Sequence, residues 1–343
     1  MITFSPRVVT KELLVELPDR SRKVLVDRFG LSLSGESRTL DAIGKEYGIT
    51  RERIRQIENH SITTIRQADS YTKHMSVWDN LKQALHTLGG VVAEDVIFVE
   101  IPKMPVDRNH VAFLLTVGHH FNDVREDVDF KRRWHIDEQL ARQVERALMA
   151  LYKETAIDTL MSEAECITLF DKMLKQEGVK TRDSDVLLRW LAISKRIGKN
   201  PLGEWGRVES PHVRVKNTRD FAYLTLKRHG SPMHFSEVAG GIKKLFGREA
   251  HPATTHNELI KDNRFVLVGR GLYALKEWGY APGIVKDVIV GVLLREGGAL
   301  DRSEIVERVK RERYVKDATI VVNLQSNMFM RTPEGKYALR AKK

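Results

Sequence analysis

Residues 39–58, TLDAIGKEYGITRERIRQIE, constrain the fold of this chain more than any other stretch, because they specify two short helices joined by a sharp turn. The first helix has apolar and small residues spaced i, i+3, i+4 and i+7, which is the spacing of one buried helical stripe. This stripe consists of Leu40, Ile43, Gly44 and Tyr47. Gly48 then supplies the backbone freedom that a tight turn needs. The pattern predicts a helix-turn-helix.

The second helix is expected to begin after Thr50, a residue type that caps helix N-termini. Its buried stripe is predicted to consist of Ile54, Ile57, Ser61 and Ile65. The opposite face of its first turns carries Arg51, Glu52, Arg55 and Gln56. Such side chains read base edges in the major groove, and they do so from the first turns of a recognition helix. The alternative is a solvated charged face, which is what most such runs form.

The match extends beyond the motif, since LPDRSRKVLVDRFGL at residues 17–31 precedes it. Together the two stretches resemble region 4 of the primary bacterial sigma factors, which recognises the promoter −35 element. The resemblance implies base readout by Arg51, Glu52 and Gln56, and backbone contacts by Thr39, Lys45, Arg53 and Arg55. It also implies that the helices around residues 11–29 clasp the flap of the RNA polymerase β subunit. The implied partners are therefore double-stranded promoter DNA with a −35-like element and bacterial RNA polymerase.

The placement of this module differs from that in sigma factors, where region 4 ends the chain. Here it lies at the N-terminus, and the resemblance stops near residue 75. A complete sigma factor also needs an aromatic-rich helix that captures the melted non-template strand. No cluster of aromatic residues interleaved with Lys and Arg precedes the module. We therefore expect duplex recognition without promoter melting.

The composition indicates a soluble globular protein of two to five small domains, with 343 residues of which 42% are hydrophobic and 30% charged. No run of eighteen apolar residues is present, and the N-terminus lacks the apolar core of a signal peptide, so we expect no membrane segment. The single cysteine, Cys166, excludes an internal disulfide and a cysteine-based zinc site. We expect it to be a small core residue. The expected location is the bacterial cytoplasm, in association with the nucleoid.

The net charge of +11 is unevenly distributed along the chain. Residues 1–75 hold 13 Lys and Arg against 10 Asp and Glu, a net charge of +3. Residues 76–212 hold 19 against 22, or −3, and residues 213–343 hold 25 against 14, or +11. A basic domain attracts the phosphate backbone whatever the base sequence. The last third of the chain is therefore the part expected to bind DNA nonspecifically.

The last third also contains a repeat of about 65 residues, a period that suits tandem small domains. LKRHGSPMHFSEVAGGIKK at residues 226–244 parallels LLREGGALDRSEIVERVKR at residues 293–311. Further on, both copies have a third helix, an alternating stretch, a glycine turn at Gly271 or Gly335 and a closing Tyr-Ala-Leu. Alternation with a glycine at the tip is a hairpin signal. Each copy is therefore predicted to be a winged helix-turn-helix.

The first copy, residues 217–280, resembles the HARE-HTH domain of the RNA polymerase delta subunit and of some restriction and chromatin proteins. The matching residues are GSPMHFSEVA and NELIKDNRFVLVGRGLYALKEWG. The middle of the chain fits two more degenerate copies, with helices expected at 81–92, 110–124, 143–156 and 185–197 and strands at 128–136 and 203–211. Trp134 and Trp205 would then take the wing position of Tyr273 and Tyr337. The alternative is an ordinary helical linker domain with two core tryptophans.

Motifs for catalysis, cofactors and metals are missing from the sequence. There is no Walker loop, no GxGxxG after a strand, no HExxH and no paired carboxylates at a strand end. His251 and His256 are five residues apart, which is poor spacing for a shared metal on one helix, and no thiolate or carboxylate completes a set. We therefore predict no enzymatic activity, no cofactor and no metal.

The predicted fold is mainly α, a series of helix-turn-helix and winged-helix domains with small β-hairpin wings. The expected domains are residues 1–75 (sigma region 4-like), 76–136 and 137–212 (both degenerate winged-helix-like), 213–280 (HARE-HTH winged helix) and 281–343 (second winged helix). The expected function is a non-catalytic DNA-binding transcription regulator that engages RNA polymerase. Two alternatives are a divergent sigma factor that initiates transcription with core polymerase, and a nucleoid or defence-system DNA-binding protein.

Overall fold

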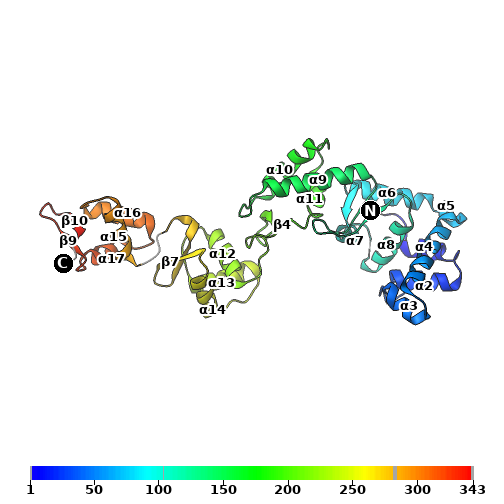
Figure 1. Cartoon of the computed structure of the whole chain (residues 1–343), viewed down its shortest axis with the longest axis horizontal. Helices are drawn as coiled ribbons and strands as arrows, with labels where there is room; N and C mark the ends of the chain where they lie inside the picture. The colour runs from blue at the N-terminus through cyan, green and yellow to red at the C-terminus, as the bar shows by residue number, and fades with distance from the viewer. Residues whose placement is uncertain (1, 103, 281–283, 341–343) are drawn as a thin grey trace. The chain divides into compact units, whose positions relative to one another are not determined.

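The computed structural model describes residues 2–102, 104–280 and 284–340. Its secondary structure is mainly helical, with small antiparallel sheets of two or three strands, as the sequence predicts. The chain divides into two compact units, residues 1–199 with 204–209 and residues 200–203 with 210–343 (Figure 1). No helix within the described ranges has the length and apolar character needed to cross a membrane.

The N-terminal part of the first unit is entirely helical. Its elements are α1 (Pro6–Leu14), α2 (Asp19–Phe29), α3 (Leu40–Tyr47), α4 (Arg51–Gln67) and α5 (Asp69–Lys73). Helices α3 and α4 begin directly after Thr39 and Thr50, the second of which is the predicted cap. The predicted helix-turn-helix is therefore present.

The next part of the first unit combines helices with a three-stranded antiparallel sheet. Its elements are α6 (Met75–Thr87), β1 (Val91–Ala93), α7 (Glu94–Glu100), η1 (Pro105–Asp107), α8 (Arg108–Val117), β2 (Asn122–Val124) and β3 (Arg133–His135). Strand β3 is central, pairing with both β1 and β2. The prediction of helices at 81–92 and 110–124 is wrong at both C-terminal ends, which form β1 and β2. Gly89 and Gly90 adopt positive φ and end α6, and the β-branched valines that follow favour a strand.

The rest of the first unit consists of three helices and a hairpin. These are α9 (Glu138–Glu154), α10 (Glu163–Gln176), α11 (Ser184–Leu191), β4 (Ile197–Lys199) and β5 (Trp205–Arg207). The helix predicted at 143–156 begins earlier, because Asp137 caps it by accepting a hydrogen bond from the Leu140 amide at 3.1 Å. The helix predicted at 185–197 is too long, since Ile197 opens β4. Cys166 is fully buried on α10, as predicted, and burial raises its pKa to about 12.

The second unit contains two sets of three helices, each followed by an antiparallel hairpin. The first set is α12 (Thr218–His229), β6 (Met233–His234), α13 (Phe235–Phe246), α14 (Pro252–Lys261), β7 (Phe265–Gly269), β8 (Leu272–Leu275) and η2 (Lys276–Trp278). The second set is α15 (Val285–Arg295), α16 (Arg302–Glu312), α17 (Asp317–Leu324), β9 (Phe329–Arg331) and β10 (Tyr337–Leu339). Both hairpins turn at the predicted glycines, Gly271 with φ +70° and Gly335 with φ +84°. Each set encloses its own cluster of buried apolar side chains.

The four aromatic residues expected at one wing position each lie on the strand of their sheet that comes last in the sequence. They are Trp134 on β3, Trp205 on β5, Tyr273 on β8 and Tyr337 on β10. The first three are buried, with 2%, 7% and 2% of their surface exposed, and Tyr337 is half-buried. Their rings are therefore used for packing.

The main core of the first unit contains side chains from both sides of residue 75, where the sequence places a domain boundary. One buried cluster joins Leu13, Leu25 and Ile65, which lie on α1, α2 and α4, with Trp78 on α6 and Phe113 on α8. The rings of Phe113 and of Phe29 in α2 form a T-shaped pair, with centroids 5.3 Å apart and planes at 76°. The helix-turn-helix is therefore packed on a scaffold that the following segment supplies.

Candidate nucleic-acid interface

The turn between α3 and α4 is closed by backbone hydrogen bonds and by two threonine caps. The Thr39 hydroxyl accepts from the Ala42 amide at 3.1 Å, and the Thr50 hydroxyl accepts from the Arg53 amide at 3.2 Å. Gly48 has φ +64°, and the Ile49 amide donates to the Gly44 carbonyl oxygen at 2.9 Å. These contacts fix the direction in which α4 leaves the turn.

Gly44 is required by the close approach of the two helices. A Cβ atom at this position would lie 2.7 Å from the carbonyl oxygen of Ile49, which is backbone and cannot move aside. The sequence assigned Gly44 to the buried stripe, and the structure confirms that it is buried. Any side chain here would push α3 away from the turn and change the angle of α4.

A small core lies beneath the helix-turn-helix, made by Val24, Ile43 and Ile54, each with 0% exposure. The predicted stripes largely agree with it. Ile43, Gly44, Ile54, Ser61 and Ile65 are buried, while Leu40, Tyr47 and Ile57 are half-buried against the core. The two helices are therefore held by packing as well as by their caps.

The opposite face of α4 is open to solvent at its N-terminal end. Arg51, Glu52, Arg53, Arg55 and Gln56 are all exposed. This array of long polar side chains faces away from the core. It has the chemistry for contact with base edges and phosphates.

Two pairs of side chains organise this face. Arg55 donates to both carboxylate oxygens of Glu52, from Nε at 2.9 Å and from Nη2 at 2.6 Å. This hydrogen bonding lowers the pKa of Glu52 and raises the pKa of Arg55. Arg53 donates from Nη1 to Oε1 of Gln56 at 3.0 Å. The side chain of Arg51 has no hydrogen bond or ion pair with the residues that the structure describes.

The other two predicted DNA contacts lie on or beside α3. Lys45 is exposed and forms an ion pair with Asp41 at 2.8 Å, which raises the pKa of Lys45. Thr39 is exposed too, but its hydroxyl already serves as the cap of α3. All seven predicted residues thus belong to one helix-turn-helix and reach solvent.

The resemblance assigns the helices around residues 11–29 to polymerase, and the inner faces of α1 and α2 are covered within this chain. Leu13 and Leu25 have 0% exposure, in the same cluster as Phe113 of α8. The outer side of α1 remains open, with Val8 54% and Val15 65% exposed. A partner of these helices would have to bind the outer side.

Asn109 and Arg66 are residues that sequence reasoning missed, and both join the helix-turn-helix to α8. Asn109 donates from Nδ2 to the carbonyl oxygens of Gly30 at 2.9 Å and Gly35 at 2.8 Å, which holds the loop before α3. Arg66 donates from α4 to the carbonyl oxygens of Thr116 and Val117. A basic residue in the last turn of a helix is a weak signal for such a role, and Asn109 carries no local signal.

The structure shows no cluster suited to a metal ion. No group of three or more His, Cys, Asp or Glu side chains that could hold one occurs in residues 2–102, 104–280 and 284–340.

Comparison with known proteins identifies the segment that carries this face. Residues 13–67 match the family model for sigma-70, region 4. The principal sigma factor HrdD of RNA polymerase in Streptomyces griseus is 41% identical over 56 residues, which are 16% of this chain and 17% of that protein. The chain thus spans about a sixth of the length of this curated relative. Residues 13–67 form a sigma-70 region 4 domain, and α1 in part, α2, α3 and α4 are its helices.

Proposed function

We propose that this chain is a non-catalytic, sequence-specific DNA-binding transcription regulator that reads a promoter −35-like element through α4. The observation that carries the proposal is the exposed face of α4 inside a region 4 domain, on a helix fixed by caps and by packing. Region 4 domains bind promoter DNA and associate with RNA polymerase, which supports polymerase as the second partner.

Each exposed side chain has a proposed role. Arg51, Glu52 and Gln56 read base edges, and Arg53, Arg55, Lys45 and Thr39 contact the backbone. Arg51 is the principal reader, since it makes no ion pair with a described residue and can turn its whole guanidinium to a guanine. The Arg55–Glu52 ion pair places a proposed base reader next to a proposed backbone contact on the exposed face.

The polymerase contact is proposed for the outer side of α1, beside Val8 and Val15. The inner side is filled by α8, so a flap helix could reach it only if α8 moved away. The outer side of α1 is therefore the part of these helices that we propose for the flap contact.

The chain is proposed to contain one region 4 module followed by four winged-helix modules. Their bounds are those expected from the sequence, residues 1–75, 76–136, 137–212, 213–280 and 281–343. The order of three helices and a hairpin in residues 218–275 and 285–339 supports the two C-terminal modules, and the first retains its proposed resemblance to HARE-HTH. Residues 213–343 carry the +11 net charge and are proposed to bind duplex DNA without sequence preference.

Two other functions have some support. Similarity to a principal sigma factor favours a divergent sigma factor, and the basic C-terminal third favours a nucleoid or defence-system protein that covers DNA. The regulator is preferred because α4 offers an intact reading face while most tryptophan rings are buried.

Genome-wide footprinting combined with native polymerase pull-down tests the proposal. Occupancy concentrated at promoters that share a −35-like hexamer, together with co-purified polymerase, is the expected result. Broad occupancy without a shared element would support the nucleoid alternative and contradict promoter recognition.

A further inference from the structure

Several Lys and Arg side chains lie around the turn between α16 and α17, and the proposed reading of promoter DNA does not involve them. Helix α17 is the third helix of its set, the position of a reading helix. Its exposed side chains are Asp317, Ala318, Thr319 and Val322. None of these is a long cationic or amide side chain of the kind that makes bidentate base contacts. The role of this set is therefore more consistent with backbone binding.

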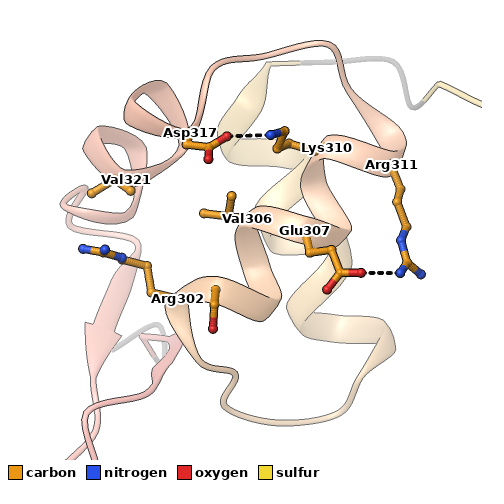
Figure 2. A pocket seen from close by; sticks show the side chains of 8 residues that line it. Arg302, Val306, Glu307, Lys310, Arg311, Asp317 and Val321 are labelled. Atoms are coloured by element: carbon orange, nitrogen blue, oxygen red, sulfur yellow. Dashed lines mark hydrogen bonds and ion pairs between the residues drawn. The ribbon is translucent and has the colours of Figure 1, made fainter.

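A groove of about 560 Å³ lies between α16 and α17 (Figure 2). Val306 and Val321 form its apolar part. Arg302 extends from the start of α16 beside Val321, and it makes no ion pair with a described residue. At the other end of the groove, Lys310 is paired with Asp317 at 2.9 Å. Arg302 is therefore available to bind an anion in the groove.

A second hollow, of about 530 Å³, also borders the Lys310–Asp317 pair. It is lined by the turn itself, with Arg313, Tyr314 and Lys316. Together the two hollows contain five cations (Arg302, Lys310, Arg311, Arg313, Lys316) and two carboxylates (Glu307, Asp317), a net charge of +3. This excess favours a negatively charged occupant.

Arg313 lines the second hollow and is itself buried. Only 4% of the residue's surface is exposed, and Nη1 donates to the carbonyl oxygen of Leu267 at 3.2 Å. Its Nε is buried without a hydrogen-bond partner in the described part of the chain. Burial lowers the pKa of Arg313, although Asp287 opposes this. Arginine keeps its proton in proteins, so Arg313 adds a positive charge beside the hollow.

We infer that the two hollows beside the Lys310–Asp317 pair hold phosphates of the duplex DNA backbone. The cations supply charge, the Ser303 hydroxyl supplies a further donor, and α17 supplies no base readers. Such contacts position a protein on DNA without reading sequence. The inference rests on the proposed DNA-binding function and adds a second, nonspecific site far along the chain from α4.

The test uses the full-length protein and the double variant Arg302→Ala/Lys316→Ala. Both side chains are exposed and neither has an ion-pair partner among the described residues, so the fold should tolerate their loss. Binding to a random duplex is measured at several salt concentrations. The plot of log K against log salt has a negative slope, and each lost phosphate contact makes it shallower by about 0.9. The slope of the double variant should therefore be shallower by about 1.8.

The matched control is Lys286→Ala/Arg340→Ala, which removes the same charge from the same set of helices outside both hollows. It should change the slope by much less than the test variant. An unchanged slope in the test variant, or an equal change in the control, would overturn the inference.

Measurement of Arg51→Ala in the same series separates this inference from the proposed function. If Arg51→Ala abolishes preference for a −35-like duplex while Arg302→Ala/Lys316→Ala leaves the salt slope unchanged, only the phosphate site is wrong. If the unmodified protein shows no preference for any duplex but the salt slope falls in the double variant, promoter reading is wrong and the phosphate site stands.

Discussion

Arg66, in the last turn of α4, donates from Nε to the carbonyl oxygen of Val117 at the end of α8, at 2.8 Å. Its Nη2 donates to the carbonyl oxygen of Thr116 at 2.9 Å. The last four carbonyl groups of a helix have no partner within the helix, so Arg66 satisfies two groups that α8 would otherwise leave open. The carbonyl groups of Thr116 and Val117, 50 and 51 positions further along the chain, therefore hold the C-terminal end of α4. The exposed face of α4 takes its orientation from this contact as well as from the turn.

Substitution of Arg66 by alanine should loosen the contact between α4 and α8. A hydrogen bond from a charged donor contributes about 1.5–3 kcal/mol, so we expect the local free energy of opening to fall by about 2 kcal/mol. Hydrogen exchange measures this, as faster exchange of amides in α8 and the C-terminal half of α4. Arg55→Ala, on the exposed face of the same helix, is the control and should leave exchange in α8 unchanged. Equal protection in Arg66→Ala and the unmodified protein would show that the contact contributes little.

Arg51→Ala should weaken binding to a −35-like duplex by about 1–3 kcal/mol, the typical value of a good side-chain contact to a base edge. Binding to a random duplex should change little. Lys45→Ala is the comparison, since a backbone contact should be lost equally on both duplexes. Competition binding on the two duplexes at one salt concentration measures both effects. Equal losses for Arg51→Ala would assign Arg51 to the phosphate backbone.

The Glu52–Arg55 pair predicts a pH dependence on the exposed face. Hydrogen bonding from Arg55 holds the pKa of Glu52 below its ordinary value of 4.5. Because the pKa in the folded state is lowered, the pair stabilises α4 at neutral pH and is lost as the pH falls through that lowered pKa. An NMR titration of the Glu52 carboxyl should therefore have its midpoint below 4.5, and Arg55→Ala should return it toward 4.5. A midpoint that Arg55→Ala leaves in place would contradict the pairing.

The helix-turn-helix could be predicted from the sequence because local rules specify nearly all of it. Apolar spacing places Ile43 and Ile54 in the core, Thr50 begins a helix and Gly48 permits the turn. The hairpins at Gly271 and Gly335 follow from equally local signals, a glycine between alternating residues. In these regions local preference and tertiary packing favour the same conformation.

The middle of the chain is harder to predict from the sequence, because tertiary contacts decide its structure. Residues 91–93 follow Gly89 and Gly90 after α6, and their strand partner is β3, which lies some forty residues further on. The role of Asn109 depends on carbonyl groups 79 and 74 positions earlier, and no local pattern encodes such a contact. The scaffold function of α8 could therefore be found only from the structure.

The last prediction is that this protein does not start transcription with core polymerase alone. Promoter opening needs flipped bases to be captured on aromatic side chains, since stacking must offset an unstacking cost of a few kcal/mol. Four of the tryptophans, Trp78, Trp134, Trp190 and Trp205, are 1%, 2%, 0% and 7% exposed and are committed to packing. Tyr314 is 57% exposed, but it lies beside α17, in a different unit from α4. A run-off assay with core enzyme and a linear −35/−10 promoter should give no specific transcript until a sigma factor is added. Specific initiation without one would falsify the accessory role and favour the divergent sigma factor.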